Sequence, residues 1–297
     1  MIKNDFASQI YRIVVPRFIR KAIHAKQLQK KVFYYYSTQS GRTTGEIEAV
    51  LNYLKTNPIA VFPYSFQNQY SEDDIEVFDD RASGLRYVML DGRKLFFKRR
   101  WSKRRIRHSF NELMKEQDPQ SPHRYLSDHF RIEDGDVLVD VGVAEGNFAL
   151  GAVEKVSRLI LFEADKEWIE ALKATFEPWK NKVVIVNKFV SDVTNATHTT
   201  LDDYLVPGER ISFLKIDVDG AESRLLDGCK RVLAEQRPLK LAVCTYHRQN
   251  DEQEFEALLS RNGFEISHSD GFMLFYHDKK IDAPYFRRGL IRAVKHA

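Results

Sequence analysis

Apolar runs and amphipathic stretches alternate along the second half of this chain. From about Asp134 onward, five runs rich in Val, Ile and Leu are typical of buried strands; they read VLVDV, LILFEA, VVIVN, ISFLKID and LKLAVCTY. The stretches NFALGAVEKV, KEWIEALKATF, AESRLLDGCKRVLAEQ and DEQEFEALLSRNG have helical periodicity. Strands alternating with helices predict an α/β fold whose mostly parallel sheet has right-handed crossovers.

The two ends of the chain show a different pattern. FEISHSD and GFMLFYHD are separated only by the pair Asp270–Gly271, which predicts an antiparallel C-terminal hairpin. In the front half, residues 6–35 have roughly helical spacing, interrupted by Pro16. GLRYVMLDGRKLFFKRRW predicts another hairpin around Asp91–Gly92. We therefore expect a basic, mainly helical N-terminal region over residues 1–115, and a sheet domain over 116–297 with a short basic C-terminal tail.

Charge separates the same two regions. Residues 1–133 hold 24 Lys and Arg against 15 Asp and Glu, or +9, whereas residues 134–297 hold 22 against 27, or −5, within a net charge of +4. Such an asymmetry suggests different partners for the two regions. No apolar run approaches the roughly 20 residues that span a bilayer, and no secretory signal is evident. Cys229 and Cys244 form no CxxC pair, so we expect no disulfide framework, no zinc site and a cytoplasmic protein.

The segment LVDVGVAEGNFAL, residues 138–150, combines a strand, a glycine loop and a helix start. Gly142 permits a sharp turn, and Gly146 permits close packing of the helix on the strand. In a dinucleotide-binding GxGxxG loop, two of the glycines would fall at Asp140 and Glu145. These carboxylates would repel a pyrophosphate by about 1 kcal/mol or more per close pair. S-adenosylmethionine has no phosphate and carries an ammonium and a sulfonium, so it suits an acidic loop; a simple turn with exposed acids is the alternative.

Two further acids follow at the ends of later strands. Glu163 lies about twenty residues after the loop, where a carboxylate accepts hydrogen bonds from ribose hydroxyls. Asp192 could accept a hydrogen bond from the amino group of adenine. An exposed Glu at a strand end and ordinary Ser-Asp turn chemistry are the respective alternatives.

The segment FLKIDVDGAES, residues 213–223, supplies a second acidic cluster. Asp217 ends a strand, so it should face the same cleft as Asp140. Asp219 or Glu222 could bind substrate, or cap the following helix. His247, in CTYHRQND, has a pKa suited to proton transfer, or is a hydrogen-bonded wall residue. We predict no metal, although Asp217 and Asp219, with His247, would be the ligands if one were present.

Five segments in this order resemble the FkbM-type methyltransferases over roughly residues 116–278; they are VDVGVAEGNFAL, LILFEAD, TTLDDYL, FLKIDVDGAE and TYHRQND. The resemblance implies a Rossmann-like, class I, S-adenosylmethionine-dependent enzyme that methylates oxygen on sugars and related metabolites. Val143 replaces the family's usual small residue after Gly142. The resemblance places Asp140, Gly142 and Gly146 on the cofactor loop, Glu163 at the ribose and Asp192 near the adenine. We also expect Glu145 and Asn147, in the same loop, to bind the cofactor. The resemblance places Asp217, Asp219 and Glu222 on the acidic signature.

We accordingly expect an O-methyltransferase acting on a sugar or glycan hydroxyl, with His247 as the first choice of base and Asp217 as the second. Asp219 and Glu222 would bind the substrate. A catalytically inactive scaffold for glycan assembly is the alternative from another class. The basic run KRRWSKRRIR could bind nucleic acid, an anionic membrane or an acidic glycan, or be a solvated face. An RNA methyltransferase is the lesser alternative, because no nucleic-acid-binding motif is present.

Overall fold

The computed structural model of the chain describes residues 17–39 and 43–297, which form two compact units. Of the described residues, the smaller unit contains 17–39 and 43–65 together with Gly271–Arg287, and the larger unit contains Phe66–Asp270 and Arg288–Ala297. The predicted break at Pro16 lies outside the described residues. The expected boundary at residue 115 differs from these limits, and the assignment of substrate binding to residues 1–115 stays a prediction.

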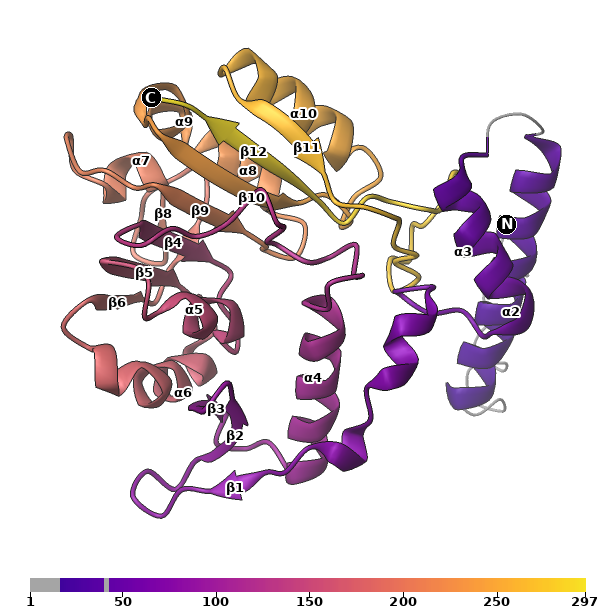
Figure 1. The fold of residues 1–297 in the computed structure, drawn as a ribbon, viewed down its shortest axis with the longest axis horizontal. Coiled ribbons are helices and arrows are strands. Elements are labelled where there is room, and N and C mark those ends of the chain that lie inside the picture. The colour runs from indigo at the N-terminus through magenta and orange to yellow at the C-terminus, as the bar shows by residue number, and fades with distance from the viewer. Residues whose placement is uncertain (1–16, 40–42) are drawn as a thin grey trace, which may run out of the picture. The chain divides into compact units, whose positions relative to one another are not determined.

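A sheet of seven strands forms the centre of the larger unit, in the order β11-β12-β10-β9-β4-β5-β6 (Figure 1). Neighbours among β10, β9, β4, β5 and β6 are parallel, whereas β12 is antiparallel to both β10 and β11. The predicted α/β, Rossmann-like, mostly parallel sheet is therefore confirmed. The seven strands are β4 (Val137–Val141), β5 (Arg158–Phe162), β6 (Val183–Val186), β9 (Phe213–Ile216), β10 (Leu239–Cys244), β11 (Glu265–His268) and β12 (Leu290–Lys295).

The predicted C-terminal hairpin is wrong in its second strand. β11 pairs with β12, not with GFMLFYHD, which the structure places in the smaller unit. β12 was not predicted as a strand, because its residues Arg292 and Lys295 suggested a basic tail. Both side chains are buried, and backbone carbonyls accept hydrogen bonds from their charged groups. Arg292 donates to the carbonyl of Tyr125 at 3.0 Å, and Lys295 to that of Leu233 at 2.7 Å.

Helices connect and cover the strands of this sheet. α6 packs against β6 and also β3, and α10 packs against β12 and β11. Most of the buried strand residues are Val, Ile, Leu and Phe, and alternate ones such as Val139, Ile160 and Leu214 belong to one apolar core. The α-helices after β4 are α5 (Asn147–Ala152), α6 (Lys166–Phe176), α7 (Leu201–Tyr204), α8 (Glu222–Asp227), α9 (Lys230–Glu235) and α10 (Asp251–Arg261). The same region contains the 3₁₀ turn η3 (Glu177–Trp179) and a short pair of strands, β7 (Phe189–Val190) and β8 (His198–Thr199).

The start of the larger unit confirms the predicted first hairpin. β2 (Arg86–Leu90) and β3 (Arg93–Phe97) pair across Asp91 and Gly92, whose φ angles of 48° and 77° suit this tight turn. The hairpin packs on α6, and the amide of Phe96 donates to the hydroxyl of Thr175 at 3.0 Å. The other elements of this region are η1 (Ser65–Gln69), η2 (Glu72–Asp74), β1 (Phe78–Asp79) and α4 (Lys103–Glu116).

The smaller unit is built from α2 (Arg17–Thr38), α3 (Gly45–Thr56) and the segment Gly271–Arg287. Its aromatic residues mainly fill a core. Tyr36 stacks on Phe286 with ring centroids 4.9 Å apart, and its hydroxyl donates to the carbonyl of Pro284 at 2.6 Å. Within the described residues, no helix has the length and apolar character needed to cross a membrane.

Candidate functional site

A cavity of about 620 Å³ opens at the carboxyl ends of β4, β5 and β9. This is the edge of a parallel sheet at which ligands bind in α/β folds. Its wall includes the loop after β4, the end of β5, the segment after β6 and one side of α4. Of the predicted site residues, the cavity is lined by Asp140, Gly142, Glu145, Asn147, Glu163, Asp217 and Asp219.

The glycine loop is shaped by two close approaches of its backbone. Gly142 has a φ of +78°, and a Cβ there would lie 1.7 Å from the carbonyl oxygen of Asp217. Gly146 has a φ of +82°, and a Cβ there would lie 2.9 Å from Leu172 of α6. Both positions therefore favour glycine. Gly146 was expected to permit packing of the following helix on the strand, but the side chains that approach it, Leu172 and Phe176, belong to α6. α5 has only six residues, so the helix dipole that we expected to help hold the ligand is short.

Asp140 lines the cavity and is buried, with 1% of its surface exposed. Its Oδ1 lies 3.0 Å from the ammonium of Lys215, which also donates to the carbonyl of Gly142 at 2.7 Å. Burial raises the pKa of Asp140, and Lys215 partly offsets this effect. Among the residues that the structure describes, none donates a hydrogen bond to Oδ2 of Asp140. That oxygen is buried but lacks a donor, so it can accept a hydrogen bond from an ammonium group that enters the cavity.

The other two acids near the loop are partly satisfied by the protein. Glu163 accepts the amide protons of Ala144 at 2.8 Å and Asp165 at 2.7 Å, which fixes its carboxylate at the cavity wall. A carboxylate has about four acceptor sites, so ribose hydroxyls could still bind it. Glu145 is buried and accepts a hydrogen bond from the hydroxyl of Ser109 at 2.8 Å, and burial raises its pKa.

Asp192 does not join the other predicted cofactor residues. Its carboxylate is bound by Arg224 at 2.8 Å and by the hydroxyl of Ser191 at 2.9 Å, and it is not among the described residues that line the cavity. Phe189 and Val190, just before it, do line the cavity. They offer an apolar face where we had expected a carboxylate.

Asp217 is the most heavily contacted carboxylate of the site. The hydroxyl of Tyr125 donates to its Oδ2 at 2.6 Å, and Nε2 of His123 lies 3.6 Å from the same oxygen. His247 lies 3.8 Å from its Oδ1. Burial raises the pKa of Asp217, but the contact with His123 and the charges of Lys215 and His247 outweigh burial, so the pKa lies well below its usual range. Asp217 therefore stays ionised and binds a proton weakly.

His247 is placed poorly for the base role that we first gave it. It is not among the described residues that line the cavity; its side chain is 5% exposed and lies within reach of Asp219 at 3.6 Å and Glu222 at 2.9 Å. Burial lowers its pKa, but the contacts with Asp219 and Glu222 and the charge of Asp217 prevail, raising the pKa to about 10. At neutral pH this histidine is a cation, which cannot accept a proton.

Glu222 and Asp219 occupy opposite environments. Glu222 is 1% exposed and accepts the amide protons of Val218 at 3.0 Å and Gly220 at 3.3 Å, so it stabilises the turn after β9. The Asp219 side chain is fully exposed at the cavity edge, with a backbone φ of 51°. Only Asp219 of this pair is open to a substrate.

Four residues that line or support the cavity were not found from the sequence. Lys215 lies inside an apolar strand, where a charge is unusual, and this was the one available signal. Glu116, the last residue of α4, lines the cavity, and its pKa is about 7. His123 and Tyr125 belong to a loop about 90 residues before Asp217, so no spacing rule connects them to it.

Part of the basic run after β3 is paired with acids of the larger unit. Lys98 pairs with Asp165, Arg99 with Glu170 and Lys103 with Asp79 at 2.7 Å. The guanidinium of Arg105 lies 4.3 Å from the ring centre of Trp101. These contacts favour the solvated, salt-bridged face among the alternatives for this run.

Comparison with solved structures finds methyltransferases at low identity. A methyltransferase FkbM from Methylobacillus flagellatus KT is 19% identical, with a TM-score of 0.44, over 56% of this chain and 44% of that one. The precorrin-6y C5,15-methyltransferase of Geobacter metallireducens GS-15 is 13% identical, with a TM-score of 0.39, over 56% and 84%. A Streptococcus mutans protein solved in complex with SAH is 13% identical, with a TM-score of 0.37, over 55% and 90%. The chain thus spans less than half the length of the Methylobacillus protein.

No curated protein matches the chain significantly. The sequence model of the methyltransferase FkbM domain, however, matches residues 95–266, which is more than half of the 297 residues. The match contains the glycine loop, Glu163 and the Asp217 segment, and S-adenosylmethionine is the methyl donor that this family and the class I fold imply. The chain belongs to the FkbM methyltransferase family.

Proposed function

We propose that this methyltransferase transfers the methyl group of S-adenosylmethionine to a hydroxyl oxygen of a sugar or glycan. The observation that carries the proposal is the composition of one cavity. The same space is bounded by the glycine loop with Asp140 and by the carboxylates of Glu116, Asp217 and Asp219. A donor site therefore adjoins a wall rich in hydrogen-bond acceptors, which suits a ligand with many hydroxyl groups.

The residues present fit the donor. When bound, S-adenosylmethionine supplies a methyl group on a positively charged sulfur. Oδ2 of Asp140 is available for its ammonium, the fixed carboxylate of Glu163 for its ribose hydroxyls, and the apolar face of Phe189 and Val190 for its adenine. Lys215 holds Asp140 in place and balances its charge. These residues orient the donor, and orientation is the main demand of an in-line displacement.

The charges around the cavity favour a neutral acceptor over a nucleic acid. The wall carries Glu112, Glu116, Asp217 and Asp219, which would repel phosphates. Three cations of the basic run that could have attracted RNA, Lys98, Arg99 and Lys103, are paired with acids of the same chain. A hydroxyl group instead donates well to a carboxylate, so the same wall binds sugars.

We assign the removal of the hydroxyl proton to Glu116. Of the three groups considered, His247 is a cation set back from the cavity, and Asp217 is a very weak base. Glu116 lies on the cavity wall at the end of α4. Burial raises its pKa to about 7; His123 lowers the pKa, and Asp217, Glu145 and Glu112 add to the rise. A base with this pKa can accept the proton near neutral pH and release it afterwards.

Two measurements test the proposal in sequence. Calorimetry with S-adenosylhomocysteine should show binding by the wild-type chain and a large loss for Asp140→Ala. Incubation with S-adenosylmethionine and panels of sugars, nucleotide sugars, glycans and RNA should then give methylated product, detected by mass spectrometry, only with the carbohydrates. Methylation of RNA alone would refute the acceptor class. Failure to bind the cofactor product would instead favour the inactive scaffold.

A further inference from the structure

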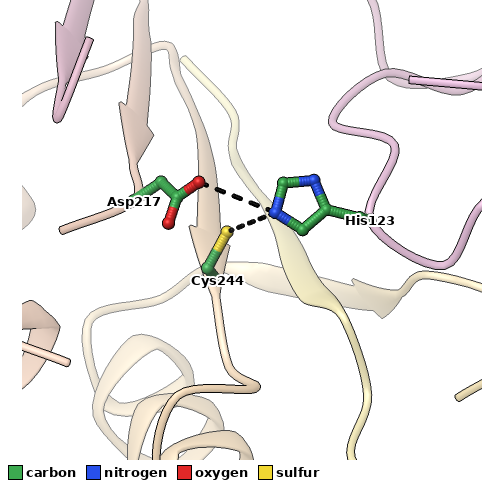
Figure 2. Close-up of side chains that lie close together, drawn as sticks. All are labelled: His123, Asp217 and Cys244. Carbon is green, nitrogen blue, oxygen red and sulfur yellow. Dashed lines mark hydrogen bonds and ion pairs between the residues drawn. The ribbon is translucent and has the colours of Figure 1, made fainter. Parts of the chain in front are cut away.

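Three metal-binding side chains from distant parts of the chain meet below the cavity. His123 belongs to the loop after α4, Asp217 follows β9, and Cys244 is the last residue of β10. Figure 2 shows the three side chains pointing toward one another. Nε2 of His123 lies 3.6 Å from Oδ2 of Asp217 and 3.7 Å from Sγ of Cys244. His123 is 1% exposed and Cys244 is fully buried.

The separations suit ligands of a shared ion. The nitrogen–oxygen distance exceeds the range of about 2.7–3.2 Å for ordinary N–H···O hydrogen bonds. Zinc binds nitrogen and oxygen at about 2.0–2.2 Å and sulfur at about 2.3 Å in a tetrahedral arrangement. Two ligands of such an ion are therefore roughly 3.3–3.6 Å apart. One ligand atom from each of the three residues lies within 4.8 Å of the other two, so the three can surround one ion, and a water molecule can supply the fourth ligand.

The kinds of ligand also point to one class of ion. A thiol, an imidazole and a carboxylate together match zinc-type ions, whereas calcium and magnesium prefer oxygen alone. We propose that His123, Asp217 and Cys244 form a binding site for a divalent, zinc-type metal ion. The ion's two charges would be balanced by the carboxylate and by a thiolate, which forms when the Cys244 proton is released to solvent on binding.

The surroundings support the three ligands in this role. Tyr125 donates to Oδ2 of Asp217 at 2.6 Å, the kind of second hydrogen bond that orients metal-binding carboxylates. The nearby ammonium of Lys215 is engaged by Asp140 and the carbonyl of Gly142. Repulsion between this ammonium and the ion opposes binding, and the adjacent Asp140 offsets part of it.

A second cluster around Asp217 is the weaker candidate. It contains Glu222 and His247, whose ligand atoms also lie within 4.8 Å of those of Asp217. Glu222, however, already accepts two backbone amide protons, from Val218 and Gly220, and contacts His247 at 2.9 Å. Metal binding there would disrupt the turn after β9, whereas the first cluster requires no such loss.

The site would have a definite structural consequence. An ion held by these residues would fasten the loop of His123 and Tyr125 to the ends of β9 and β10. Asp217 and Tyr125 both line the cavity, so their positions on its wall would depend on the ion. Cys229, the other buried cysteine, lies next to α9 and outside the cluster, which makes it a matched control.

The experiment measures metal in the full chain and needs no enzymatic activity. After purification without chelators and dialysis against Zn²⁺, elemental analysis should give one zinc per wild-type and Cys229→Ser chain. Cys244→Ser and His123→Ala should retain almost none. Tyr125→Phe should weaken zinc affinity by about 10–100-fold. Equal zinc in wild type and Cys244→Ser, or no zinc in the wild type, would overturn the proposal.

A second readout covers variants that fail to fold. Wild-type protein loaded with Co²⁺ should show the absorption of a thiolate bound to cobalt, and Cys229→Ser should show the same band. Absence of this band from the wild type also rules the site out. Calorimetry with S-adenosylhomocysteine on the same samples separates loss of the metal from failure of the proposed methyltransferase function.

Discussion

The close approach of Gly142 to β9 permits a sharp test of how the loop is built. In Gly142→Ala, the new Cβ would lie 1.7 Å from the carbonyl oxygen of Asp217 and 2.8 Å from its carbonyl carbon. No side-chain rotation relieves this overlap, because both partners are backbone atoms. The loop or the end of β9 must move, and Asp217 moves with it.

The magnitude follows from two separable contributions. A non-glycine residue at a φ of +78° costs about 1–2 kcal/mol. Overpacking against a fixed neighbour costs about 1–3 kcal/mol more. Gly135→Ala isolates the first contribution, because Gly135 has a φ of +87° and a Cβ added there would meet nothing within 4 Å. Gly142→Ala should therefore be less stable than Gly135→Ala by about 1–3 kcal/mol.

Thermal unfolding and calorimetry together provide the assay. For a domain of about 150–250 residues, each kcal/mol lowers Tm by about 2–4 °C, so Gly142→Ala should melt roughly 2–12 °C below Gly135→Ala. Displacement of the loop should also weaken S-adenosylhomocysteine binding at least tenfold, or about 1.4 kcal/mol, while Gly135→Ala binds normally. Equal melting temperatures and equal affinities for the two variants would refute the account of the loop.

The further predictions concern three charged residues, Glu116, Lys215 and Asp192. Glu116→Gln should lower kcat by about 10²–10⁴-fold with S-adenosylhomocysteine affinity unchanged, whereas Glu112→Gln, on the same wall, should retain most activity. In chelator-treated wild type, kcat should fall as the pH drops through about 7, because Glu116 gains a proton there; a flat profile contradicts its role. Lys215→Met should destabilise the fold by about 3–5 kcal/mol in chemical denaturation, since it leaves Asp140 buried without its partner. If the variant unfolded at the same denaturant midpoint as the wild type, a stabilising Lys215–Asp140 pair would be excluded. Asp192→Ala should bind S-adenosylhomocysteine as tightly as wild type, and a clear loss would restore Asp192 to the adenine site.

The central sheet could be predicted because its strands obey simple patterning. Each of β4, β5, β9 and β10 is an apolar run buried on both faces, and helices follow at the expected intervals. β12 breaks this rule, since the buried Arg292 and Lys295 are stabilised by carbonyls of Tyr125 and Leu233. Those carbonyls belong to other parts of the fold, so no local pattern marks β12 as a strand.

The candidate site was likewise predictable only where local sequence determines the structure. Residues set by one strand and its following loop, such as Asp140, Gly142 and Asp217, line the same cavity, and strand order alone suggests this. The environment of each side chain was not predictable, because it depends on residues far away in sequence. Contacts with Asp219 and Glu222 and the charge of Asp217 outweigh burial and raise the pKa of His247 to about 10. The residue that was expected to be a base is therefore a cation.

Pairing also changes the electrostatic argument about the glycine loop. An acidic loop repels phosphates only to the extent that its charges are uncompensated, and Asp140 lies 3.0 Å from the ammonium of Lys215. The opposite charges of Asp140 and Lys215 nearly cancel at a distance. Close to the pair, Oδ2 of Asp140 still acts as a hydrogen-bond acceptor, and it has no donor among the described residues. Selection of an ammonium ligand thus rests on a hydrogen-bond position rather than on net charge. A pyrophosphate would still be rejected, because its oxygens cannot donate to that carboxylate.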